Sequence, residues 1–194
     1  AGLADRPDLA PDLRLDGAEA FLAAGAPAAA VLLLGRVWED LDEAASCRAL
    51  RILVEARLTQ GDDAGAMERG RTMAAQCGSR PGEVVQALDR LADLGPAADA
   101  FELALDLLDR LHEADQVRRI VVAAVRAGRR AGLDLEKVGD RLAKASKGWK
   151  GEVEVAGVLA ATGRYASAAQ LLEAARQRNP REGATLKRIF MLHR

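Results

Sequence analysis

The sequence predicts an all-α fold, and three observations lead to that prediction. Apolar residues recur at intervals near 3.6 along the chain, which is the period of an amphipathic helix. Alanine, leucine and valine supply most of the apolar residues, whereas aromatic residues make up only 3%. Such alanine-rich sequence with few β-branched runs favours helix over strand. Glycine, proline and aspartate interrupt the pattern at regular distances, as they do at helix termini.

About eleven helices follow from this pattern, and no segment predicts a strand. Residues 1–15, with Pro7, Pro11 and alternating aspartates, predict an extended lead-in. The expected helices are 16–25, 27–40, 43–60, 63–77, 81–94, 97–112, 115–131, 134–146, 149–162, 165–178 and 182–192.

Several of these helices have specific start signals. Pro81 suits the first turn of a helix, and Ser79 offers a cap for the same helix. Asp62 and Asp63 lie where a helix N-terminus favours negative charge. These signals support the predicted helix boundaries.

Turn glycines reveal an internal repeat. The glycines at positions 25, 61, 95 and 163 are separated by 36, 34 and 68 residues, and the last interval is twice 34. Each is followed five residues later by an alanine, so the glycine–alanine pairs are Gly25–Ala30, Gly61–Ala66, Gly95–Ala100 and Gly163–Ala168. The repeat missing from the last interval falls around residues 128–132, where the turn has extra residues and Gly139 stands at an expected alanine position.

The segment 163–180, GRYASAAQLLEAARQRNP, carries the clearest motif, formed by Gly163, Tyr165, Ala168, Leu172, Ala175 and Pro180. It resembles the second half of a tetratricopeptide repeat (TPR), a helix–turn–helix unit of about 34 residues. By that resemblance, Gly163 supplies a left-handed residue, Tyr165 wedges between helices, and the alanines let helix axes approach closely. Pro180 ends the second helix.

The resemblance covers roughly residues 16–180 and implies a right-handed αα-superhelix, a TPR-like solenoid of about five helix pairs. Residues 181–194 are then a C-terminal capping helix, or alternatively an apolar face that belongs to a following domain. In the earlier units Pro27, Asp63 and Ala97 stand at the position of Tyr165. This departure leaves open a related αα-solenoid that is not built from true TPR units.

Catalytic and metal-binding motifs are absent from the sequence. No glycine-rich nucleotide-binding motif, nucleophile elbow or paired-histidine zinc spacing occurs. The two histidines, His112 and His193, lie far apart near helix ends, where a histidine suits the helix dipole. We therefore expect no enzyme activity, catalytic residue, metal or cofactor.

The two cysteines lie symmetrically about the predicted turn at Gly61–Asp62. Cys47 and Cys77 are each 15 residues from Asp62, so an antiparallel hairpin places them at the same height. Two interpretations remain open. They are either buried thiols in a reducing compartment, or a disulfide or redox-sensitive pair.

Charge is distributed unevenly along the chain, although the net charge is only −1. Residues 1–115 contain 11 basic and 22 acidic residues, whereas residues 116–194 contain 17 basic and 7 acidic residues. The basic part has one helical stripe at Arg119, Arg126 and Arg130, and a second at Lys137, Arg141 and Lys144. Such stripes are either solvated faces or recognition surfaces for an acidic peptide or nucleic acid.

Nucleic acid is the weaker of these partners. Single-strand binding usually combines positive charge with stacking aromatic residues, and Trp149 beside Lys147 and Lys150 is the one such place. The acidic first part of the chain would also repel a polyanion.

The resemblance also implies a binding site, because TPR solenoids bind peptides or helices on the concave surface lined by the first helix of each repeat. The subclass that grips C-terminal carboxylates needs asparagines there, and the only asparagine of this chain is Asn179, in a turn. The expected partner-binding residues are Arg48, Arg51, Glu55, Asp89, Asp93, Arg119, Arg126, Arg130 and Lys150.

We therefore expect a non-catalytic interaction scaffold or adaptor that binds a protein or peptide, with an acidic partner as one option at the basic C-terminal half. Self-association is also open, because the acidic front could meet the basic back. One alternative function is the substrate-recruiting region of a larger bacterial enzyme, such as a glycosyltransferase or sulfotransferase. The other is a periplasmic assembly scaffold.

The sequence also bears on location. No apolar run is long enough to span a bilayer, and no basic-then-apolar signal sequence opens the chain. The expected location is cytoplasmic, with the periplasm as the alternative.

Overall fold

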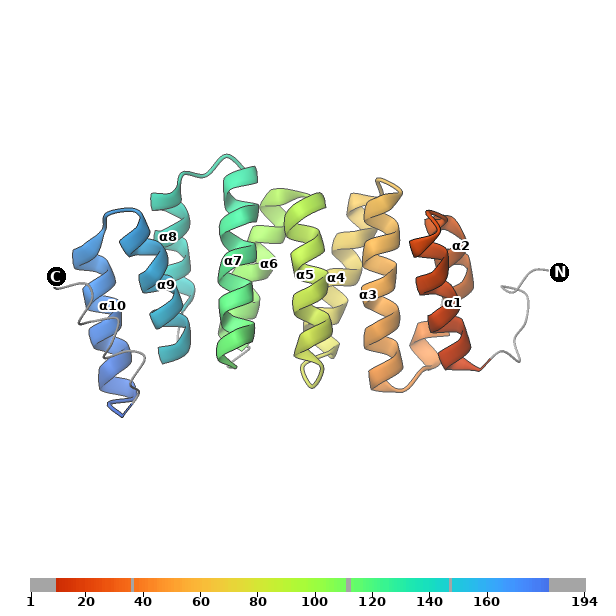
Figure 1. The fold of residues 1–194 in the computed structure, drawn as a ribbon, viewed down its shortest axis with the longest axis horizontal. Helices are drawn as coiled ribbons and strands as arrows, with labels where there is room; N and C mark the ends of the chain where they lie inside the picture. The colour runs from red at the N-terminus through yellow and green to blue at the C-terminus, as the bar shows by residue number, and fades with distance from the viewer. Residues whose placement is uncertain (1–9, 36, 111–112, 147, 182–194) are drawn as a thin grey trace. The chain divides into compact units, whose positions relative to one another are not determined.

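The computed structural model describes residues 10–35, 37–110, 113–146 and 148–181. Within them lie ten α-helices and a short 3-10 helix, with no strand (Figure 1). The elements are α1 (Pro11–Ala23), α2 (Pro27–Leu34), η2 (Val37–Asp40), α3 (Glu43–Thr59), α4 (Asp63–Gln76), α5 (Pro81–Leu94), α6 (Ala97–Arg110), α7 (Ala114–Arg130), α8 (Leu135–Ala145), α9 (Trp149–Ala161) and α10 (Tyr165–Arg178). The predicted all-α class is confirmed.

The helices form two compact units that divide after Pro96. In the first unit α1 packs on α2, α3 packs on α4, and α3 also contacts α1 and α5. Figure 1 shows α1, α3 and α5 side by side, with α2 and α4 behind them. In the second unit α7 packs on α6, α8 and α9, and α9 packs on α8 and α10. Each unit therefore contains two helical hairpins, α1–α2 and α3–α4 in the first and α7–α8 and α9–α10 in the second.

The turn glycines have the backbone that a helical hairpin requires, with one exception. Gly25, Gly61 and Gly163 have φ of +71°, +74° and +78°, a region that glycine enters without steric cost. Gly95, in contrast, has φ of −81° and an extended backbone. In the irregular fourth turn the left-handed residue is Gly132, with φ of +80°.

Two predicted helix boundaries differ from the structure. The first helix begins at Pro11, where a proline fits the first turn, so the expected extended lead-in over 1–15 is wrong from Pro11 onward. The second helix ends at Leu34 rather than at residue 40, because Gly35 has φ of +44° and η2 follows it. The expected closing helix at 182–192 lies outside the described residues.

Alanines at the helix contacts form part of the core. All four that follow the turn glycines by five residues are fully buried, namely Ala30, Ala66, Ala100 and Ala168. A buried residue without side-chain bulk lets neighbouring helices approach closely at native packing density. The regular alanine spacing in the sequence therefore identified real contact points.

Tyr165 does not wedge between helices as expected, because 59% of its surface is exposed. It is the first residue of α10, and helical side chains tilt toward the N-terminus. Its side chain is therefore largely exposed to solvent instead of buried in the helix pair. The motif alanines Ala168 and Ala175 are buried, as their packing role predicts, and Leu172 is buried as well.

The fourth hairpin, α7–α8, achieves close packing with a glycine instead of an alanine. Val138 is fully buried at the start of α8, and a Cβ at Gly128 of α7 would lie only 2.6 Å from its Cγ2 atom. The same Cβ would lie 3.4 Å from two ring carbons of Phe101. The missing side chain at Gly128 thus makes room for the larger residue at Val138.

We expect Gly128→Ala to destabilise the protein despite the better helix propensity of alanine. An added methyl group in this tightly packed contact should cost about 1–3 kcal/mol of stability. The higher helix propensity of alanine returns only about 1 kcal/mol. Urea unfolding of Gly128→Ala, Val138→Ala and the double variant measures the coupling. The two changes together should cost less than the sum of the separate losses.

Gly82→Ala is the matched control, because a Cβ at Gly82 in α5 meets nothing within 4 Å. It should stabilise by about 0.5 kcal/mol. Equal effects of Gly82→Ala and Gly128→Ala would contradict the packing explanation.

Candidate functional site

A row of ion pairs joins the first helices of the first unit. Arg48 on α3 donates to Asp16 and Glu19 on α1, at Nη2–Oδ1 2.8 Å and Nη2–Oε2 2.5 Å. Arg51, one turn later, pairs with Glu19 as well and donates from Nε to Glu83 Oε2 on α5 at 2.6 Å. Two arginines of α3 are thus each held by two carboxylates of neighbouring helices.

The row continues one turn further along α3. Glu55 Oε1 accepts a hydrogen bond from Arg90 Nη2 of α5 at 2.8 Å. We call the surface formed by these residues the unit 1 charged face, which comprises Asp16, Glu19, Arg48, Arg51, Glu55, Glu83 and Arg90. It contains three of the predicted partner-binding residues, Arg48, Arg51 and Glu55.

The electrostatics of this face favour the charged forms of its residues. A hydrogen bond from Arg48, helped by one from Arg51, holds the pKa of Glu19 below its ordinary value despite partial burial. The hydrogen bond from Glu19, with one from Asp16, raises the pKa of Arg48. The guanidinium groups are only partly exposed, 31% at Arg48 and 18% at Arg51. These arginines are therefore positioned and neutralised by residues of the same chain.

The remaining predicted residues lie on the corresponding helices. Asp89 and Asp93 are on α5 in the first unit, where Asp89 is half-buried and Asp93 is exposed. Arg119, Arg126 and Arg130 are all on α7 in the second unit. Arg119 and Arg130 are exposed, whereas Arg126 is half-buried. The predicted residues thus fall into one group in each unit.

In the second unit two ion pairs link α7 and α9 near their N-terminal ends. Lys150 Nζ lies 3.6 Å from Glu113 Oε2, and Arg118 Nε lies 3.7 Å from Glu154 Oε2. The Lys150 ammonium is also 5.8 Å from the ring centre of Trp149, a favourable cation–π distance. We call the surface of these two helices the α7–α9 face.

The partners of Arg48, Arg51 and Glu55 were missed by the sequence interpretation. Asp16, Glu19, Glu83 and Arg90 are separated from the residues they bind by 29 to 35 positions. Opposite charges about one repeat length apart on first helices would have identified them. That signal was present in the sequence, but it requires knowing which helices are neighbours.

Cys47 and Cys77 are joined by a disulfide in the structure, with their Cα atoms 5.8 Å apart. The bond ties α3 to the C-terminal end of α4, and both residues are buried. Beyond it, Ser79 donates a hydrogen bond to Glu43 at the start of α3. The disulfide thus fixes the hairpin that carries Arg48 and Arg51.

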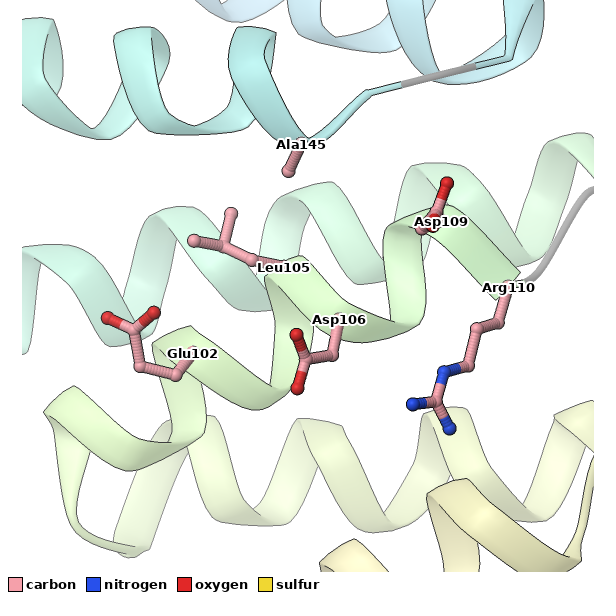
Figure 2. Close-up of a pocket in the computed structure, with 6 residues that line it drawn as sticks. All are labelled: Glu102, Leu105, Asp106, Asp109, Arg110 and Ala145. Atoms are coloured by element: carbon pink, nitrogen blue, oxygen red, sulfur yellow. The ribbon is translucent and has the colours of Figure 1, made fainter.

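A cavity of about 330 Å³ lies between α6 and the end of α8. Figure 2 shows Leu105 and Asp109 on the side of α6 that faces Ala145. Glu102, Asp106 and Arg110 complete the lining, and Glu102 is paired with Arg141 of α8 at 2.6 Å. Among the described residues no group of three or more His, Cys, Asp or Glu is arranged to hold a metal ion.

The apolar helices lack the length needed for a membrane span. In the part of the chain that the structure describes, none combines enough residues with enough hydrophobicity to cross a bilayer.

We expect the Cys47–Cys77 disulfide to stabilise the first unit. Closing a loop with a sequence separation of 30 residues is worth about 3.5 kcal/mol in the chain-entropy model. Urea unfolding with and without reductant should reveal a loss of that size, and the Cys47→Ala/Cys77→Ala variant should match the reduced protein. Protein unfolded without reductant should titrate no free thiol, and finding two would contradict the disulfide.

Acid should weaken the unit 1 charged face through Glu19. The pKa of Glu19 is lower in the folded protein than in the unfolded chain. The ionised Glu19 carboxylate therefore stabilises the folded protein fully above its unfolded-state pKa. That stabilisation is lost as pH falls through the folded-state pKa. Glu19→Gln should therefore cost about 1 kcal/mol near neutral pH, as expected for a partly exposed ion-pair network. The difference from wild type should shrink at about pH 3.

Urea unfolding at both pH values measures this effect. Glu68→Gln is the matched control, because Glu68 is exposed on α4 and makes no ion pair with the described residues. If the two variants lose stability equally, Glu19 has no special role.

The fold was also compared with known proteins. No protein-family model and no curated protein matches the chain. A solved structure that matches is a thermophilic TPR protein of Thermus thermophilus, with 18% sequence identity and a TM-score of 0.45. The match covers 94% of this chain and 98% of that one. At this level of similarity the assignment rests on the hairpins themselves, which make the chain an all-α helical-repeat protein.

Proposed function

We propose that this chain is a non-catalytic interaction module that binds a protein or peptide on the exposed face of the first helices within a unit. The observation that carries the proposal is the unit 1 charged face, where ion pairs link α1, α3 and α5. These side chains lie outside the apolar core and remain partly exposed. A face held in one arrangement before binding loses less conformational entropy when a partner docks.

The two units would contribute differently to such binding. In the first unit, Arg48, Arg51 and Glu55 already have partners, so they would recognise a ligand by exchanging or extending ion pairs. Asp89 and Asp93 would add negative charge on α5. In the second unit, Arg119, Arg126, Arg130 and Lys150 would form a positively charged binding surface of that unit. Charge complementarity of this kind sets orientation and association rate more than affinity.

A second candidate function is an assembly scaffold in an oxidising compartment such as the periplasm. The buried Cys47–Cys77 disulfide favours it, because disulfides persist in oxidising compartments and are rare in the cytosol. The binding face would be the same in both cases. Thiol trapping in intact producing cells distinguishes the two, since a cytosolic scaffold would hold reduced cysteines.

We expect peptides selected from a displayed random library to bind the whole chain through this face. The Arg119→Glu/Arg126→Glu/Arg130→Glu variant should bind the selected peptides about tenfold more weakly, a loss of about 1.4 kcal/mol. Affinity should also fall as salt rises above about 0.15 M. Isothermal calorimetry on folded protein measures both effects.

The matched control is Lys137→Glu/Lys144→Glu, which reverses charge at exposed positions of α8, a second helix of a hairpin. Thermal unfolding of each variant confirms that it is folded. Failure to select any peptide, or equal loss in the control, would reject the proposed binding face.

A further inference from the structure

The contact line between α7 and α9 has a defined register. Both ion pairs join residues that are 36 or 37 positions apart, Arg118 to Glu154 and Glu113 to Lys150. Because both pairs have nearly the same offset, the two helices run parallel. Residues one turn further along each helix therefore lie opposite one another.

The ion pairs give way to apolar residues one turn further along. Val122 is four residues after Arg118, and Val158 is four residues after Glu154, so the register places them opposite each other. Val122 is 51% exposed, and Val158 is partly exposed. In the first unit the corresponding contact line between α3 and α5 carries a second ion pair, Glu55–Arg90. The α7–α9 face therefore has an apolar patch, Val122 and Val158, whereas the unit 1 charged face has an ion pair at the corresponding position.

Beyond the apolar patch, only α7 carries positively charged residues. After Glu154, α9 contains no charged residue up to its end at Ala161. In contrast, α7 ends with Arg126, Arg129 and Arg130. Arg129 is exposed and makes no ion pair with the described residues. On this face α9 thus supplies no carboxylate to the end of α7.

We infer that the α7–α9 face takes an extended acidic peptide, with an apolar side chain on Val122 and Val158 and a carboxylate on Arg129. This inference rests on the proposed function and names the partner class for one part of that site. Charge complementarity argues for an acidic occupant, since α7 and α9 together contain 6 basic and 3 acidic residues. An arginine side chain can bind a carboxylate with two parallel hydrogen bonds.

Geometry sets the spacing within the peptide. Val122 and Arg129 are seven residues apart on α7, which is about 10 Å at about 1.5 Å per helical residue. An extended peptide covers the same distance in about three residues, at about 3.3 Å each. The recognised segment therefore carries an apolar and an acidic residue about three positions apart.

The test uses a labelled peptide of about twelve residues that contains leucine and glutamate three positions apart in a glycine–serine background. Two comparison peptides are used. In one, serine replaces leucine, and in the other, lysine replaces glutamate. Fluorescence anisotropy with the full chain should detect binding of the first peptide, and each replacement should weaken it about tenfold.

Two variants locate the site on the protein. Arg129→Glu and Val122→Ser should each weaken the leucine–glutamate peptide about tenfold. Both side chains are exposed, so neither change removes core packing. The control Lys144→Glu makes the same charge change as Arg129→Glu, on the exposed surface of α8, and should leave affinity within about twofold.

Three results would overturn the inference. In the first, the leucine–glutamate peptide does not bind although library-selected peptides still do. That result would reject this inference but not the proposed function. The second is binding that Arg129→Glu and Val122→Ser do not change. The third is Arg129-dependent binding of a short oligothymidylate without peptide binding, which would assign the face to nucleic acid. Loss of all peptide binding, selected peptides included, would reject the proposed function as well.

Discussion

Close approach of helix axes at residues with little or no side chain is the constraint on which this structure depends. A single amphipathic helix cannot shield its own apolar stripe, so each one needs a neighbour. The buried alanines Ala30, Ala66 and Ala168 permit that approach in three hairpins. In the α7–α8 hairpin, close approach of the helices depends on the absence of a side chain at Gly128, which faces the larger Val138.

Packing of this kind leaves the exposed side of each first helix available for charge. In the first unit that side is occupied by arginines and carboxylates that bind one another across α1, α3 and α5. The core provides the free energy of folding, because half-exposed ion pairs contribute little. The ion pairs instead hold the surface side chains in one arrangement. The Cys47–Cys77 disulfide adds a covalent constraint on the same hairpin.

The second unit uses the same architecture with a different surface. Its α7–α9 face begins with two ion pairs and continues with Val122 and Val158, whereas arginines follow on α7 alone. The late part of α9 therefore offers Arg129 no carboxylate, unlike α1 and α5 beside α3. This difference is the physical reason for assigning the recognition of an acidic peptide to the second unit.

Local signals in the sequence determined the helices, most of their limits and the hairpin turns. Asp62 caps α4 by accepting a hydrogen bond from Gly65 N–H at 3.0 Å, and Pro81 opens α5, as the sequence indicated. Both features depend only on residues a few positions away. The end of α2 at Leu34 was missed because apolar residues resume at Val37 and Trp38, whereas the backbone of Gly35 decides the break. The candidate site could be predicted only in part, since Arg48 and Arg51 were found without Glu19 or Glu83.

The sequence by itself determined an all-helical repeat protein with acidic and basic halves and two cysteines placed for pairing. Only the tertiary structure decided which charges are neutralised, which glycine turns the fourth hairpin, and that Tyr165 faces solvent. Secondary structure follows from neighbours in the chain. An ion pair or a buried contact depends on residues about one repeat away, and its partner becomes known only once the helices have packed.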